Sequence, residues 1–316
     1  MNALTVGYRP PHELFDVADG RLAAALRRAE GGGIDRICVG DHVTFRDGRG
    51  FDGIVHATAV AMLTERAVVQ TAVYLLALRH PVTVARQVAS LAALAPGRFS
   101  FGVGAGGDDR AEVEACGVDP ATRGRRTDES LAALRVLLDG GAVTSEGEFF
   151  ALRGVRVLPT PAERVPVVVG GRSAPALRRA GALGDGWLGL WVTPERWAAA
   201  VASVEAAGAA SGRVAVGWWH GLQVWCAFGA SRADARAAVA AAMEDLYQLP
   251  FSRFERYVPV GRPADVAGAL APYVEAGCRN FNLIPVAPSV NESVDGVAEV
   301  RSLLVTGTGS APESVI

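Results

Sequence analysis

The stretch from His80 to Gly107, HPVTVARQVASLAALAPGRFSFGVGAGG, constrains the fold more than any other part of this chain. It predicts a helix that has Pro81 in its first turn, where the missing N–H of proline would have no partner, and that ends at Pro96-Gly97. The apolar run from Arg98 to Val103 is typical of a strand buried on both faces. Three glycines follow the carboxyl end of this strand: Gly104, Gly106 and Gly107. Parallel α/β proteins bind ligands at that end of their strands, so the glycines predict a binding turn.

Strand and helix patterns alternate along the whole chain. Strands are predicted at residues 4–8, 34–39, 67–75, 98–103, 165–169, 187–192, 222–228 and 278–286. Helices are predicted at residues 21–29, 54–63, 81–95, 127–138, 173–183, 194–207, 233–246, 263–275 and 294–304. Strands that are each followed by a helix make a (β/α)8 TIM barrel of about 250 residues, and the surplus goes into insertions. The alternative is a doubly wound open sheet, which rarely needs so many regular repeats.

We expect one barrel domain over residues 1–305, because no linker or internal repeat divides the chain. Residues 140–158 are expected to form an inserted hairpin. The small and polar tail, residues 306–316, is expected to be disordered.

Composition excludes several classes of function. The 316 residues are 50% hydrophobic and 20% charged, which is typical of a globular protein, and the net charge of -2 argues against binding to nucleic acid or a membrane surface. All 31 basic residues are arginines, so no lysine Schiff base or P-loop lysine can exist here. The 4 cysteines form no CxxC pair and the amino terminus resembles no signal peptide. We therefore expect a cytoplasmic protein, and the sequence predicts no metal site.

A second glycine cluster, Gly170-Gly171, follows the strand predicted at 165–169. Arg172 and Ser173 come next, and Ser173 is placed to cap the following helix. Free N–H groups at a helix start attract a phosphate, although the dipole alone contributes only about 0.3–1 kcal/mol. Both clusters together favour a phosphate or cofactor site, and the alternative is that the glycines only make tight turns.

The pair Asp41-His42 ends the second predicted strand. An imidazole at the carboxyl end of a barrel strand can donate to a bound ring or exchange a proton with it. The alternative is a loop histidine that bonds only to the backbone.

At these residues the sequence resembles the bacterial luciferase-like superfamily, and most of all its branch of coenzyme F420-dependent oxidoreductases from actinobacteria. The resemblance rests on Gly40-Asp41-His42, on the stretch from His80 to Gly107, on GVDPATRGRRTD from Gly117, on PVVVGGRSAPALRRAGALGDGWLGLW from Pro166, and on Val260 to Asp265 followed by Glu275-Ala276-Gly277. It covers nearly the whole chain.

The resemblance implies a deazaflavin or flavin lying across the mouth of the barrel. A non-proline cis peptide bond, here Ala72-Val73, would form a bulge that presses on the central ring, and His42 would lie near its reactive carbon. The residues expected to bind the cofactor are Asp41, Ala72, Val73, Gly104, Gly106, Gly107, Gly170, Gly171, Arg172 and Ser173.

The chain departs from the relatives that oxidise glucose 6-phosphate. Those relatives have a glutamate as proton donor where this chain has Gly107, and they bind the sugar phosphate with lysines, which are absent here. Glucose 6-phosphate is therefore not the expected substrate. Asp108 is the acid we would test first, and the alternative is that Asp108, Asp109 and Glu112 are solvated loop carboxylates.

Aromatic and basic side chains complete the predicted site. The substrate pocket is expected to be apolar and to include Phe45, Tyr74, Trp191 and His220, with core packing as the alternative for each. Arg125 and Arg126 stand at a helix start, where a cation opposes the dipole. They favour an anionic partner, unless they pair with Asp128 and Glu129.

The function expected from sequence is hydride transfer between F420 and a small organic substrate, in which the cofactor supplies the chemistry and the protein the orientation. The alternatives are a monooxygenase that uses reduced FMN, and a barrel that binds a flavin without catalysis. The resemblance also implies a homodimer.

Overall fold

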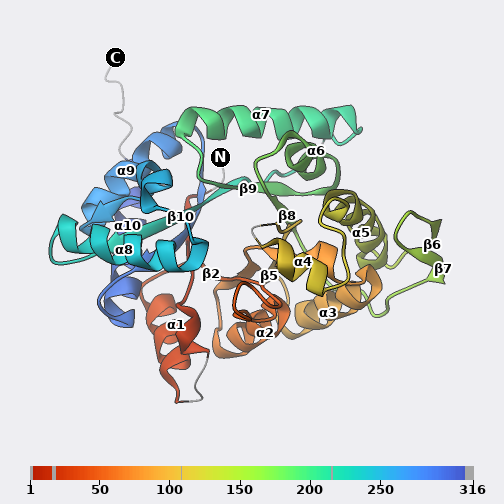
Figure 1. Ribbon diagram of the computed structural model, residues 1–316, viewed down its shortest axis with the longest axis horizontal. Helices are drawn as coiled ribbons and strands as arrows, with labels where there is room; N and C mark the ends of the chain where they lie inside the picture. Colours follow the sequence, from red (N-terminus) through yellow and green to blue (C-terminus); the bar gives the residue numbers. More distant parts are fainter. Residues whose placement is uncertain (1–2, 16–18, 108, 215, 310–316) are drawn as a thin grey trace. The chain divides into compact units, whose positions relative to one another are not determined.

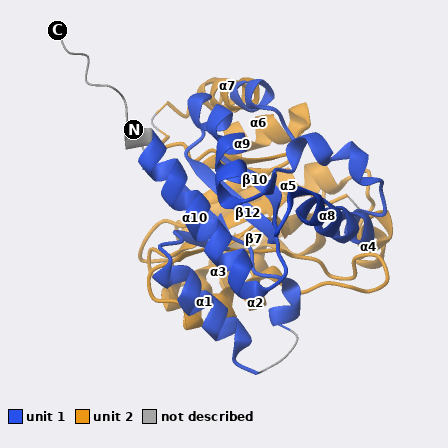
Figure 2. Ribbon diagram, turned by 90° about the vertical axis from the view of Figure 1, so that its left-hand side faces the viewer, with its two compact units in different colours: residues 1–37, 191–198, 221–316 blue, residues 38–190, 199–220 orange. Residues whose placement is uncertain are grey.

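The computed structural model describes residues 3–15, 19–107, 109–214 and 216–309 of the chain. These residues divide into two compact units, which Figure 2 colours separately. Unit 1 comprises residues 1–37, 191–198 and 221–316, and unit 2 comprises residues 38–190 and 199–220. Each unit is described by itself.

Unit 1 contains a parallel sheet built around β1 (Thr5–Tyr8). β1 pairs with β12 (Asn280–Val286) on one side, and on the other side Gly7 and Tyr8 pair with the first residues of β2 (Arg36–Val39). β12 pairs in turn with β10 (Gly221–Phe228), whose end pairs with the short β11 (Val260–Gly261).

The helices of unit 1 cover this sheet (Figure 1). They are α1 (Arg21–Gly31), α8 (Arg232–Tyr247), α9 (Pro263–Glu275) and α10 (Val290–Gly309), with short 3-10 turns at His12–Leu14, Phe251–Arg253 and Glu255–Tyr257. α8 buries Val239 and Met243 against Trp225 of β10 and Phe251. Burial of such large apolar side chains stabilises the fold by about 1.5–3 kcal/mol each.

Unit 2 contains the parallel strands β3 (Val68–Thr71), β4 (Tyr74–Leu75), β5 (Phe99–Gly104), β8 (Val167–Gly170) and β9 (Gly186–Leu190). β5 pairs with β3 and β4 on one side and with β8 on the other, and β8 pairs with β9. All six residues of β5 are buried, as expected for a strand covered on both faces.

The helices of unit 2 are α2 (Gly53–Leu63), α3 (Pro81–Leu94), α4 (Arg110–Ala115), α5 (Arg123–Leu138) and α6 (Ala174–Leu183), and a 3-10 turn spans Leu76–Leu78. The helix α7 (Pro194–Ala210) and β2 each cross the boundary between the units. α3 starts as its sequence predicts: the His80 side chain accepts from Val82 N–H, and Pro81 occupies the first helical position. Its apolar face, which includes Val84, Val88 and Leu91, is buried.

The fold is the (β/α)8 barrel with insertions that the sequence predicts, because parallel strands alternate with helices through both units. The predicted hairpin is also confirmed, since β6 (Val143–Glu146) and β7 (Ala151–Val155) pair antiparallel. Glu129 of α5 anchors this hairpin by accepting from the N–H groups of Phe149 and Phe150. The single domain over residues 1–305 stays a prediction.

Several predicted boundaries are wrong. The third strand is not continuous over 67–75, because it breaks between Thr71 and Tyr74. α10 continues to Gly309, so the first four residues of the tail that we expected to be disordered are helical. The remainder of that tail, 310–316, lies outside the described residues.

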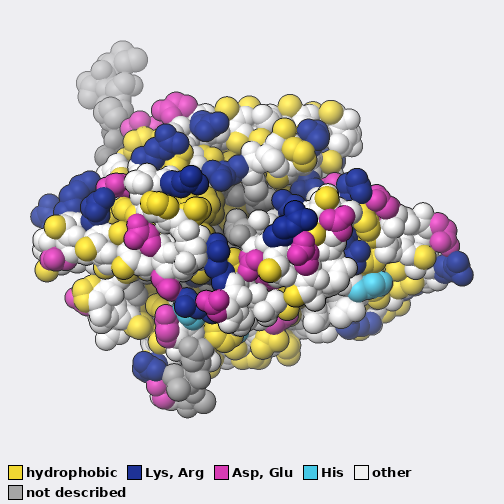
Figure 3. Space-filling model, viewed as in Figure 1, with side chains coloured by type: hydrophobic (Ala, Val, Ile, Leu, Met, Phe, Trp, Pro, Cys, Tyr) yellow, Lys and Arg dark blue, Asp and Glu magenta, His cyan; other side chains and the backbone are white. Residues whose placement is uncertain are grey.

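The surface carries both signs of charge. On the face drawn in Figure 3, basic and acidic side chains are interspersed with apolar ones. Within the described residues, no helix is long and apolar enough to cross a membrane.

Candidate functional site

Two glycine turns lie side by side in unit 2. β5 and β8 are neighbours in register, with Val103 opposite Val169, so Gly104 and Gly170 end adjacent strands (Figure 1). The turns that follow them are exposed, whereas the strands before them are buried. The two predicted turns are therefore brought together at one end of the strands.

Val73 lies over both strand ends. The Ala72-Val73 peptide bond is cis, as the resemblance implies. A Cβ built on Gly104 would lie 2.6 Å from Cγ2 of Val73, and one built on Gly170 would lie 3.1 Å from its Cγ1. These two glycines are needed because the Val73 side chain fills the space where their own would stand. Ala72 points elsewhere and packs with Cys38, Val168 and Leu188 in the buried interior.

The backbone of both turns offers hydrogen-bond donors. Gly106, Gly107 and Gly171 have φ values of 69°, 124° and 117°, which side chains rarely adopt. Within the described residues, no acceptor lies within hydrogen-bonding distance of their N–H groups. Ser173 caps α6 as predicted, since its Oγ accepts from Ala176 N–H at 3.4 Å. Exposed N–H groups next to a helix start form a site suited to an anion.

The contacts of the arginines near the glycine turns differ from those predicted from the sequence. Arg125 pairs with Glu148 at 2.8 Å, and Arg126 donates to Ala77 O at 2.9 Å while stacking over the ring of Phe150. The basic group at the glycine turn is instead Arg123, whose Nε donates to Gly106 O at 3.2 Å. Arg172 lies exposed on the second turn.

His42 is held by a buried carboxylate. Its Nδ1 lies 3.0 Å from Oε2 of Glu112, whose side chain is 3% exposed. The other oxygen, Oε1, accepts from the N–H groups of Val43 at 2.6 Å and Thr44 at 3.2 Å. The ring of Phe45 lies tilted by 35° against that of His42 with centroids 4.2 Å apart, so Phe45 lies beside the predicted catalytic residue.

This contact determines which ring nitrogen carries the proton. Burial by itself raises the pKa of Glu112, but the hydrogen bonds from His42, Val43 and Thr44 outweigh it and hold the pKa below its usual value. An ionised carboxylate only accepts, so Nδ1 of His42 carries the hydrogen. Nε2 of the neutral ring is then left as an acceptor, and the side chain is 31% exposed.

Asp41 is buried, and its contacts are those of a structural residue. Its carboxylate pairs with Arg79 through both oxygens, at 2.5 and 2.9 Å, and it accepts from the N–H groups of Gly53 and Leu75, both at 2.8 Å. Burial raises the pKa of Asp41, and these four donors oppose that rise. With its oxygens so occupied, Asp41 holds the loop after β2 to β4 and has no side-chain surface left for a ligand.

Two residues expected in the substrate pocket, Tyr74 and His220, are buried. Tyr74 is wholly buried between Phe101 and Arg79, and burial raises the pKa of its phenol. His220 precedes β10, at the amino end of that strand, where it is buried beside Glu205 and stacks on Trp218. Burial lowers the pKa of His220 to about 4.

Trp191, the third aromatic residue expected in the pocket, is half-buried. It lies just after β9, at a φ of 53°, and belongs to unit 1. There its ring packs against Tyr247 and Phe254 at centroid distances of 5.0 and 4.7 Å. Trp191 thus packs against an apolar cluster and stays partly exposed, so its place in the substrate pocket remains a prediction.

Asp108 and Asp109 are the loop carboxylates that follow the first glycine turn, and the role of Asp108 as proton donor stays a prediction. Asp108 lies outside the described residues. Asp109 caps α4 and accepts from the N–H groups of Arg46 and Ala111, and these bonds hold its pKa below the usual range. A carboxylate in that state is a poor acid near neutral pH.

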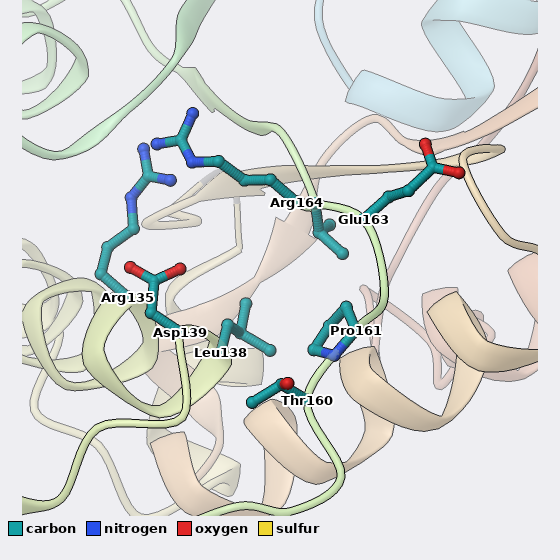
Figure 4. Close-up of a pocket in the computed structure, with 8 residues that line it drawn as sticks. Arg135, Leu138, Asp139, Thr160, Pro161, Glu163 and Arg164 are labelled. Atoms are coloured by element: carbon teal, nitrogen blue, oxygen red, sulfur yellow. The ribbon is translucent and has the colours of Figure 1, made fainter.

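A pocket of about 210 Å³ lies at the other end of β8 (Figure 4). Arg135, Arg164 and Arg213 share one oxygen of Asp185 there, at 2.7, 2.8 and 3.3 Å. The lining residues are Arg135, Leu138, Asp139, Thr160, Pro161, Glu163, Arg164 and Val165. The lining holds two arginines and two carboxylates, so their charges offset one another, and Val165 places the pocket at the amino end of β8, opposite the glycine turn.

The comparison with known families identifies the chain. The model of the family described as luciferase-like monooxygenase matches residues 16–257. The chain belongs to this family.

Individual relatives agree with this assignment. An F420-dependent glucose-6-phosphate dehydrogenase of Kineococcus radiotolerans is 34% identical over 194 residues, which cover 58% of this chain and 56% of that protein. An uncharacterised protein of Mycobacterium tuberculosis is 37% identical over 145 residues, covering 46% and 50%. The chain thus matches about half the length of these relatives.

A solved structure shows that the fold is shared over nearly the whole chain. An F420-dependent secondary alcohol dehydrogenase in complex with an F420-acetone adduct superposes with a TM-score of 0.84 at 21% identity. The match covers 96% of this chain and 99% of that one. At this identity the likeness supports the barrel fold of this luciferase-like protein and no finer property.

Proposed function

We propose that this luciferase-like protein is an F420-dependent oxidoreductase that moves a hydride between the deazaflavin and a small organic substrate. The observation that carries the proposal is the apposition of the two glycine turns beneath Val73, in the same unit as His42. The similarity to F420-dependent glucose-6-phosphate dehydrogenases supports the choice of cofactor.

The residues present fit a phosphate-bearing cofactor. The N–H groups of Gly106, Gly107 and Gly171 are exposed donors that a phosphate would satisfy, and the capped start of α6 adds its dipole. Side chains at these positions would strain the backbone, so glycine is favoured there. The missing side chains leave the N–H groups open to a ligand. When bound, F420 supplies or accepts the hydride, and the protein supplies orientation.

His42 is the residue we assign to proton transfer. Because Glu112 fixes the hydrogen on Nδ1, Nε2 can accept a proton from a substrate hydroxyl or return one to a carbonyl oxygen. The Glu112 carboxylate stabilises the imidazolium that forms when Nε2 is protonated. Phe45 covers one face of the ring and limits its rotation.

The substrate we propose is an uncharged or weakly charged organic molecule. Glucose 6-phosphate is disfavoured because the chain has no lysine and has Gly107 where the relatives that oxidise this sugar have their glutamate. Val73, which is half-buried, offers apolar surface at the turns, whereas Phe45 is buried against His42.

A monooxygenase that uses reduced FMN is the second candidate, because the family model carries that description. The same turns suit the phosphate of FMN. The third candidate is a barrel that binds a cofactor without catalysis. The positioning of His42 and its loop by Glu112 argues against it.

Equilibrium titration with oxidised F420 and with FMN tests the proposal. We expect F420 to bind at least about tenfold more tightly than FMN, a difference of about 1.4 kcal/mol. Tighter binding of FMN, together with oxygen consumption when the flavin is reduced, would favour the monooxygenase. Binding of neither cofactor would overturn both.

The homodimer and the cytoplasmic location expected from the sequence remain proposals. Sedimentation equilibrium of the purified chain tests the first, and fractionation of the producing cells tests the second.

A further inference from the structure

We propose that Arg123 is the cationic residue that recognises the phosphate group of the ligand at the Gly104–Gly107 turn. The inference rests on the proposed function, because it assigns a partner to the same anion site. No pattern in the sequence singled out this arginine, since the basic residues noted there were Arg125 and Arg126.

Arg123 lies directly against the turn. A Cβ built on Gly107 would lie 2.8 Å from its Nε and 3.0 Å from its Nη2. Its Nε donates to Gly106 O at 3.2 Å and its Nη1 donates to Pro120 O. The absence of a side chain at Gly107 is thus what lets the guanidinium approach the backbone.

The guanidinium charge of Arg123 has no carboxylate partner among the described residues. Within the described part of the chain, its side-chain partners are the two carbonyl oxygens, and no carboxylate pairs with it. Arg123 is also the first residue of α5, where a cation opposes the helix dipole, and the first turn contains no acidic residue. An arginine so placed is suited to an anion that arrives with a ligand.

The neighbouring arginines of α5 show the contrast. Arg125 pairs with Glu148, and Arg126 is engaged by Ala77 O and the ring of Phe150. Arg123 alone among these three combines a missing counter-charge with a place at the turn. Its free Nη2 donors and the N–H groups of Gly106 and Gly107 make up one set of donors for a tetrahedral oxyanion.

The affinity of the full-length protein for oxidised F420, measured by equilibrium titration at several salt concentrations, tests this role. Arg123→Gln keeps a donor for the carbonyl oxygens but removes the charge. We expect it to weaken F420 binding about tenfold and to flatten the salt dependence. Arg123→Lys, which keeps the charge, should stay within about threefold of the wild type, and Arg125→Gln, the matched control, should bind as the wild type does.

Two outcomes would overturn the inference. One is an unchanged affinity in Arg123→Gln. The other is an equal loss in Arg123→Gln and Arg123→Lys together with a lower urea midpoint in both, because the arginine would then only build the turn.

A second measurement is independent of the cofactor's identity. Inorganic phosphate should raise the melting temperature of the wild type and of Arg125→Gln, and should raise that of Arg123→Gln much less. If the wild type binds neither F420 nor FMN, the proposed function fails, yet the phosphate measurement still decides the role of Arg123. An equal rise in all three proteins would contradict the inference.

Discussion

Nδ1 of His42 lies 3.0 Å from Oε2 of Glu112, and the two residues come from different segments, the loop after β2 and the helix α4. Oε1 of the same carboxylate accepts from the backbone of the His42 loop. One buried side chain therefore fixes both the position of the loop and the tautomer of its histidine.

Replacing His42 by alanine should lower turnover with F420 by about 100-fold or more, because positioned proton transfer typically contributes that much. The affinity for F420 should change by no more than about threefold, since the anion site lies on the glycine turns. Steady-state kinetics and titration provide the two values. His12→Ala, at an exposed histidine, serves as the control, and equal turnover in H42A and wild type would show that His42 is structural.

Replacing Glu112 by glutamine should reduce kcat more than it changes the affinity for F420. The amide keeps an oxygen for the N–H groups of Val43 and Thr44, but its NH2 group cannot accept from Nδ1–H, so the favoured tautomer changes. The pH profile of kcat should shift as well, because the imidazolium loses its carboxylate. Loss of stability with an unaltered pH profile of the remaining activity would assign Glu112 a purely structural role.

Glu112 also predicts how stability depends on pH. The pKa of Glu112 is lowered on folding, so the group stabilises the native state at pH values above 4.5, its pKa in the unfolded chain. This contribution is lost as the pH falls through the lower pKa of the folded state. Urea unfolding measured from neutral to acidic pH should show a larger decline in the free energy of unfolding for the wild type than for Glu112→Gln. Parallel curves for the two proteins would contradict this.

Gly104→Ala should destabilise the protein by about 1–3 kcal/mol, because the new Cβ would lie 2.6 Å from Cγ2 of the stiff Val73 side chain. Adding Val73→Ala should recover much of that loss, and a double-mutant cycle of urea unfolding measures the coupling. Gly268→Ala is the control, since its Cβ would meet nothing within 4 Å. Additive effects of the two substitutions would argue against the contact.

Asp41→Asn should lower the free energy of unfolding by about 3–5 kcal/mol, because it leaves Arg79 without its buried partner. The affinity for F420 should be preserved where the variant is folded, since the carboxylate is saturated by the protein. Asp47→Asn, in the exposed loop, is the matched control. A stable Asp41→Asn with weakened cofactor binding would restore the cofactor-binding role expected from sequence.

Elements and the ends of strands were predictable because their signals are local. The glycines after β5 and β8, Pro81 and Ser173 each act within a few residues, so the turns and caps follow from the sequence. Which turns become neighbours follows from the parallel order of a barrel. The cis bond at Ala72-Val73 came from the family resemblance, since alanine and valine carry no local signal for it.

The partners of the site residues were not predictable in the same way. Glu112, Arg79 and Arg123 act on residues that are 70, 38 and 17 positions away in sequence, and only the folded chain brings them together. Tyr74 was misassigned because an aromatic residue at a strand end can face either the helices or the ligand, and sequence alone does not decide which. His220 was misassigned because it precedes its strand, which places it at the amino end.

A crystal structure of the protein with oxidised F420 would show directly whether the glycine turns bind the cofactor. We expect the phosphate to accept from the N–H groups of Gly106, Gly107 and Gly171, and the deazaflavin to lie against Val73 with Nε2 of His42 facing it. A cofactor bound elsewhere, with its phosphate away from both glycine turns, would contradict the account.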